Sequence, residues 1–64
     1  MLITAEQILD KYPQLPDLFK RGSWRKYELQ DKLTITRGEV DLIISILTME
    51  GFIKSTSIGW VWND

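Results

Sequence analysis

The sequence predicts a small α+β domain that is mostly helical, with three helices followed by a short C-terminal β-hairpin. Apolar residues recur at helical spacing in successive segments before residue 51, and two of these segments begin with capping-box sequences. After residue 51, β-branched and aromatic residues surround a turn rich in Ser, Thr and Gly. A chain of 64 residues is expected to form one domain over residues 1–64, with a thin core.

The first helix is predicted to begin after Thr4, because Thr4 and Gln7 have the spacing of a capping box. Pro13 is expected to end this helix near Tyr12. The segment that follows, PQLPDLFKRG, is interpreted as one helical turn or a brief helix, with Pro16 at a first helical position and Gly22 at its C-terminal end.

Ser23 is the predicted N-cap of a second helix over WRKYELQDKL. After a break at residues 34–35, Thr36 and Glu39 form a second capping box and open a third helix, which Gly51 ends. One face of this third helix is apolar and is expected to face the core: Val40, Ile43, Ile44 and Leu47. The segment FIKSTSIGWVWN is the predicted hairpin.

The composition argues against an enzyme. Without His or Cys, the usual zinc sites and the Ser–His–Asp and Cys–His arrangements cannot form, and there is no Gly-rich phosphate loop. We therefore expect no cofactor and no metal. The sequence has neither the pattern of a signal peptide nor an apolar run long enough to span a membrane, so a cytoplasmic protein is expected.

The charge is unevenly distributed along the chain. The overall charge of −1 argues mildly against nucleic-acid binding, since phosphate neutralisation dominates that affinity. Residues 20–37, however, hold six basic and two acidic side chains, a net charge of +4. The middle of the chain is therefore where binding to DNA should be tested.

The order of the predicted elements and the spacing of residues 28–53 resemble the winged helix-turn-helix superfamily. The positions that carry the resemblance are Glu28, Leu29, Leu33, Ile35, Val40, Ile44, Leu47, Gly51, Phe52 and Ile53. The resemblance implies a three-helix winged helix-turn-helix fold with the hairpin as its wing. It also implies a DNA-binding regulator of transcription that contacts duplex DNA through the starts of the second and third helices and the wing. The DNA-contacting residues would be Arg25, Lys26, Thr36, Arg37, Lys54 and Thr56.

In this interpretation Arg25 and Lys26 clamp phosphates, Arg37 enters the edge of the major groove, and Lys54 with Thr56 places the wing on the backbone. The third helix departs from the family pattern. Its acids, Glu39 and Asp41 among them, approach phosphates with the wrong sign. Arg37 is also spaced to pair with Asp41, four residues on.

Leu42, Ile46 and Met49 form a second apolar stripe on the third helix, here called the outer stripe. It either packs beneath the first helix and the 15–19 segment or forms a surface for a partner protein or a homodimer. Trp60 and Trp62 alternate, so both rings face one side of the hairpin. That side is either the core or, if Val61 faces inward, an exposed aromatic patch.

Two functions remain open from the sequence. One is a small winged-helix regulator that binds duplex DNA as a dimer. The other is a winged helix that serves as a protein–protein interaction module, for dimerisation or as an adaptor, with little or no DNA binding. The anchors of the second would be Leu42, Ile46, Met49, Trp60 and Trp62.

Overall fold

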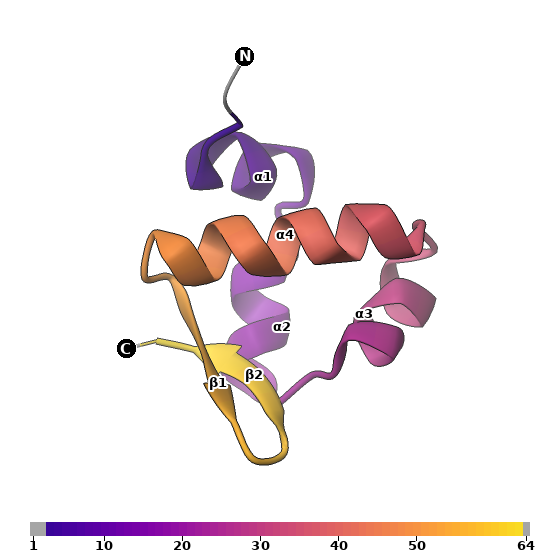
Figure 1. The fold of residues 1–64 in the computed structure, drawn as a ribbon, viewed down its shortest axis with the longest axis vertical. Coiled ribbons are helices and arrows are strands. Elements are labelled where there is room, and N and C mark those ends of the chain that lie inside the picture. The colour runs from indigo at the N-terminus through magenta and orange to yellow at the C-terminus, as the bar shows by residue number, and fades with distance from the viewer. Residues whose placement is uncertain (1–2, 64) are drawn as a thin grey trace.

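The computed structural model describes residues 3–63, which form an α+β domain of four α-helices and one two-stranded antiparallel sheet (Figure 1). The mostly helical fold with a terminal hairpin is therefore confirmed, but the predicted number of three helices is wrong. The elements are α1 (Ala5–Lys11), α2 (Leu15–Arg21), α3 (Lys26–Leu33), α4 (Arg37–Met49), β1 (Ile53–Thr56) and β2 (Gly59–Trp62).

The additional helix is α2, formed by the segment predicted as a brief helix or a single turn. This helix is stable because three of its apolar side chains are buried, those of Leu15, Leu18 and Phe19. Pro16 lies in the first turn, where a backbone N–H has no partner within the helix, so the missing N–H of proline costs nothing. Gly22 follows the last helical residue in an extended conformation, with φ 173°. Burial against the core, rather than a glycine cap, therefore stabilises this short helix.

The helix starts follow the capping residues in two of the three predicted cases. The Thr4 side chain accepts a hydrogen bond from the Gln7 backbone N–H, and the Gln7 side chain accepts one from the Thr4 N–H, so the first capping box is complete. Thr36 likewise accepts from the backbone N–H of Glu39 at 3.2 Å. The Glu39 side chain does not complete that second box, because it is hydrogen-bonded to α1 instead.

The predicted cap at Ser23 is wrong, because α3 begins at Lys26 with Arg25 as its N-cap residue. Trp24 lies outside the helix and pairs with Trp60 as an isolated antiparallel bridge. Two backbone hydrogen bonds form it, Trp24 N to Trp60 O at 2.9 Å and Trp60 N to Trp24 O at 2.8 Å. This pairing holds the chain extended up to Arg25 and joins it to the edge of the hairpin at β2.

The end of α4 and the hairpin follow the prediction. Gly51 has a positive φ of 83°, the left-handed conformation that ends helices and favours glycine. The strands then pair in the register Ile53↔Trp62, Lys54↔Val61, Ser55↔Trp60 and Thr56↔Gly59. Ile53 is buried, and Trp60 and Trp62 pack against the core, so the aromatic side of the hairpin faces inward. Lys54 and Thr56 consequently lie on its outer face.

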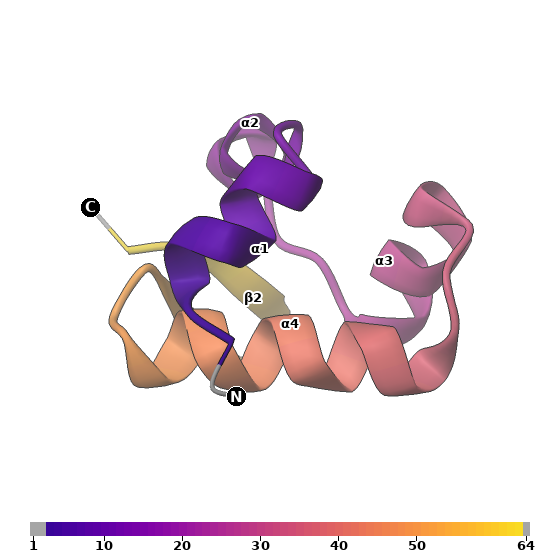
Figure 2. The same ribbon diagram turned by 90° about the horizontal axis from the view of Figure 1, so that it is seen from above.

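The helix α4 crosses the molecule, with α1 on one side and α2, α3 and the hairpin on the other (Figure 1). Seen from above, α4 lies along one edge of the domain, and α1, α2, α3 and β2 all lie to one side of it (Figure 2). The inner face of α4 forms the middle of the core. The core residues are Ala5, Ile8, Leu15, Phe19, Leu29, Val40, Ile43, Ile44, Ile46, Leu47 and Ile53.

Two classes of feature are missing from residues 3–63. None of the helices in this range is long and apolar enough to cross a membrane. Over the same range, no group of three or more His, Cys, Asp or Glu side chains gathers in a way that could hold a metal ion.

Candidate nucleic-acid interface

The six residues predicted to contact DNA are all exposed: Arg25, Lys26, Thr36, Arg37, Lys54 and Thr56. They occupy three places in the fold. Two are the N-cap and first residue of α3, two are the N-cap and first residue of α4, and two are alternate residues of β1. The structure therefore leaves the tips of these elements free to meet a ligand, and four of the six side chains are cationic.

Two of the cations lie close together. Lys26 and Arg37 line one shallow hollow of about 290 Å³ between α3 and the start of α4, together with Tyr27 and Gln30. Tyr27 is 68% exposed. The hollow thus combines two positive charges with an aromatic ring and an amide, groups that can neutralise and position a phosphate or stack against a sugar or a base.

Asp41, the acid that the sequence placed on the outer face of α4, pairs with α3. Its Oδ1 lies 3.2 Å from Lys26 Nζ, and the two side chains are 47% and 51% exposed. The pairing of Asp41 with Arg37, expected from their spacing, does not form. An ion pair this exposed contributes only about 0–1 kcal/mol to stability, so Lys26 is not locked in place.

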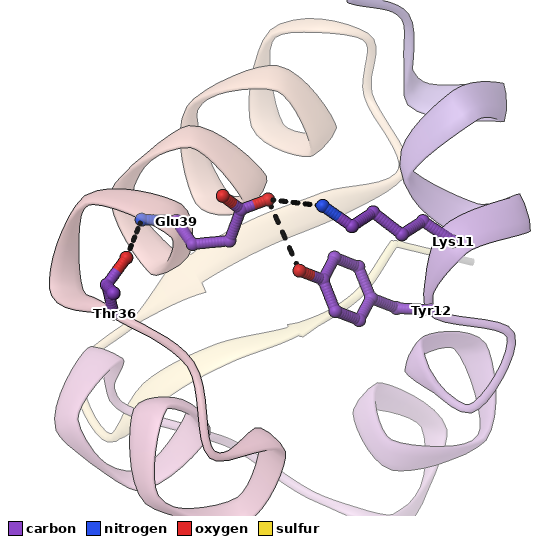
Figure 3. A network of polar contacts seen from close by, with 4 residues as sticks. All are labelled: Lys11, Tyr12, Thr36 and Glu39. Carbon is purple, nitrogen blue, oxygen red and sulfur yellow. Dashed lines mark hydrogen bonds and ion pairs between the residues drawn. The ribbon is translucent and has the colours of Figure 1, made fainter.

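The carboxylate of Glu39 points towards α1 and not towards the face proposed to contact DNA (Figure 3). Glu39 Oε1 accepts hydrogen bonds from Lys11 Nζ at 3.4 Å and from the Tyr12 hydroxyl at 3.2 Å. The hydrogen bond to Glu39, with the attraction of its charge, raises the pKa of Lys11 above the ordinary lysine value. The first turn of α4 is in this way tied to the end of α1.

Glu50, which follows α4, also forms a hydrogen bond to α1, at the other end of α4. Its Oε2 accepts a hydrogen bond of 2.8 Å from the backbone N–H of Ala5, the first residue of α1. Glu39, Asp41 and Glu50 therefore all have partners inside the domain. These acids hold α1 and α3 against α4, and this structural role was not found from the sequence because every partner is distant along the chain.

Three other outward positions of α4 are small and uncharged. Gly38, Ser45 and Thr48 are exposed, and they lie with Arg37 and Asp41 on one face at about 100° per residue. A Cβ at Gly38 would meet no other atom within 4 Å, so the space above it is open. This face therefore lets another molecule approach the helix backbone closely.

The outer stripe is divided between core and surface. Ile46 is 8% exposed and belongs to the core, and Leu42 is half-buried and packs against it. Only Met49, at 77%, is exposed. Packing within the domain thus accounts for Ile46 and for part of Leu42, which also lines an open hollow of about 190 Å³ beside α1.

The two tryptophans of the hairpin, Trp60 and Trp62, also pack against the core. The rings of Trp62 and Phe52 lie 6.0 Å apart between centroids, and Lys20 Nζ lies 5.5 Å from the centroid of the Trp62 ring. Trp60 pairs with Trp24 through its backbone. Four of the five residues predicted as protein-interface anchors are therefore partly or fully buried, namely Leu42, Ile46, Trp60 and Trp62.

The outer face of the hairpin carries the two remaining candidates. Lys54 is exposed and pairs across the sheet with Val61. The Thr56 hydroxyl donates to Gly59 O at 2.7 Å and accepts from Ile58 N at 3.3 Å, so it shapes the turn. Lys54 is consequently the cation that this hairpin offers to a ligand, while Thr56 sets the shape of its tip.

Comparison of the chain with protein-family models, with curated proteins and with solved structures found no match.

Proposed function

We propose that this protein is a winged helix-turn-helix domain that binds duplex DNA, as a small regulator of transcription. One observation carries the proposal. All six residues expected to contact DNA are exposed, whereas four of the five residues expected to anchor a protein partner pack in or against the core.

The arrangement of the elements supports this proposal. Helix α3, the turn at residues 34–36 and helix α4 have the order of a helix-turn-helix, and the hairpin that follows is suited to act as a wing. The bridge between Trp24 and Trp60 ties the start of α3 to β2. The start of the helix-turn-helix and the wing are thus held in a fixed relation, as a common binding surface requires.

In the proposed complex, α4 enters the major groove with its exposed edge. Arg25 and Lys26 neutralise phosphates on one side, Arg37 enters the groove edge, and Lys54 meets the backbone from the wing. Gly38 and Ser45 allow the helix to approach closely. Glu39 and Glu50 are hydrogen-bonded to α1 and so are directed away from the proposed surface, while Asp41 remains on it, paired with Lys26.

Salt-dependent binding to a mixed-sequence duplex, measured by fluorescence anisotropy, tests the proposal. Neutralising three to four phosphates should give a plot of log K against log[salt] with a slope of about −3 to −4. The double variant Arg25→Glu/Arg37→Glu should lose this binding. The control variant Arg21→Glu/Lys32→Glu changes the net charge equally at other exposed positions and should retain most of it.

Two results would overturn the proposal. One is the absence of duplex binding by the parent protein at low salt. The other is equal affinity of the parent and the Arg25→Glu/Arg37→Glu variant, in a sample whose circular dichroism shows that the variant is folded.

A further inference from the structure

Asp41 differs from the other acids associated with α4 in the surface that it faces. The carboxylate of Glu39 is 31% exposed and is held by two residues of α1, and that of Glu50 caps the start of α1. Asp41 instead lies among Arg37, Ser45 and Thr48 on the exposed edge of α4, with 47% of its side chain exposed. It is therefore the acid of α4 that would face bound DNA.

The ion pair of Asp41 with Lys26 opposes nonspecific binding in two ways. The carboxylate repels phosphates, and it occupies the ammonium group of Lys26, whose Nζ is 3.2 Å away. At about 0–1 kcal/mol, the pair is weak enough to exchange for other partners. Lys26 can thus move to a phosphate, and this exchange is most favourable when Asp41 finds a hydrogen-bond donor to replace the ammonium group.

The major groove offers few such donors. A carboxylate is an acceptor only, so the acceptor groups of guanine and thymine repel it. The exposed amino groups are N4 of cytosine and N6 of adenine, and the N6 of adenine lies beside the N7 acceptor of the same base. Cytosine is therefore the base that a single carboxylate reads best.

We propose that Asp41 makes tight DNA binding conditional on a cytosine opposite it, an inference that rests on the proposed function and deepens it. On such a site the cytosine N4 amino group donates to the Asp41 carboxylate, and Lys26 is released to contact a phosphate. On other sequences Asp41 gains no donor from the base and competes with the phosphates for Lys26, so binding is weaker. Asp41 is in this way a specificity-determining residue that acts both directly and through Lys26.

The first test compares the variant Asp41→Ala with the control Asp31→Ala. Asp31 is an exposed carboxylate of α3 beside Trp24 and Tyr27, so its loss changes the net charge equally at another place. The probe is a mixed-sequence duplex about two helical turns long. Asp41→Ala should bind it about three- to tenfold more tightly than the parent, with a salt slope steeper by about 1, because Lys26 gains a phosphate. Asp31→Ala should behave as the parent does.

The second test selects bound sequences from a randomised duplex library. The parent and Asp31→Ala should select sites with one invariant C·G pair, and Asp41→Ala should lose that preference while still binding. Equal affinities of the parent and Asp41→Ala, equal gains in both variants, or an unchanged C·G preference in Asp41→Ala would each overturn this inference alone. Absence of duplex binding by the parent and by both variants would overturn the proposed function and this inference together.

Discussion

The hydroxyl of Tyr12 donates a hydrogen bond of 3.2 Å to Glu39, and this contact joins the end of α1 to the first turn of α4. Because Glu39 is charged and only partly exposed, the bond should contribute about 1–2 kcal/mol to the free energy of unfolding. Tyr12→Phe is expected to lose that amount in chemical denaturation. Tyr27→Phe is the control, because the Tyr27 ring is 68% exposed, and it should unfold as the parent does. Equal stability of Tyr12→Phe and the parent would contradict the contact.

The pKa of Lys11 should report the same contact. The hydrogen bond to Glu39 and the attraction of its charge raise this pKa above the ordinary value of 10.5. A raised folded pKa means that the contribution to stability is full below pH 10.5 and is lost as the pH rises through the folded pKa. An NMR titration should show the Lys11 pKa above 10.5 in the parent and lower in Glu39→Gln than in the parent. A pKa that does not change in Glu39→Gln would show that the ion pair does not form in solution.

Gly59 is required by the bridge between Trp24 and β2. Its φ is +134°, and a Cβ there would lie 2.9 Å from the Trp24 backbone carbonyl carbon. Gly59→Ala should therefore destabilise the protein by at least about 1–3 kcal/mol in thermal or chemical unfolding. Gly38→Ala is the matched change in the first turn of α4, and it should raise stability by no more than about 0.5 kcal/mol because the added Cβ meets nothing within 4 Å. A Gly59→Ala variant with the stability of the parent would contradict this close approach.

Mutations in the outer stripe should change stability by different amounts at its buried and its exposed positions. Ile46→Ala removes a side chain that is 8% exposed and should cost about 2–5 kcal/mol. Met49→Ala, at a position 77% exposed, should change stability by no more than about 0.5 kcal/mol. We also expect the mass from light scattering to be that of a monomer in the parent and in Met49→Glu, since four of the five predicted anchors are used in the fold. A parent dimer that Met49→Glu dissociates would support the protein-interaction function instead.

The parts of the fold that depend on neighbouring residues could be predicted from the sequence. Thr4 and Thr36 begin helices because a hydroxyl satisfies a backbone N–H three residues on, and Gly51 ends one because it accepts a positive φ. The start of α3 could not be predicted in the same way. Ser23 is a good local cap, but the pairing of Trp24 with Trp60 holds the chain extended past it, and nothing near Ser23 in the sequence indicates that partner.

In the candidate site too, only the features that depend on neighbouring residues could be predicted from the sequence. The exposure of Arg25, Arg37 and Lys54 follows from their places at element ends and on the polar side of a strand. The roles of the acids do not, because Glu39 and Asp41 have partners on other helices. From the sequence, these negative charges on the predicted DNA-contacting helix argue against DNA binding. In the structure each of the two acids has a partner within the domain.

The central claim is that duplex DNA binds across the exposed tips of α3, α4 and the hairpin. An NMR titration of the parent protein with a mixed-sequence duplex tests it most directly, because every backbone amide reports separately. Binding at these tips should give salt-sensitive shift changes centred on Arg25, Lys26, Arg37 and Lys54, with α1 and α2 largely unchanged. Shift changes confined to α1 and α2, or none at low salt, would contradict it.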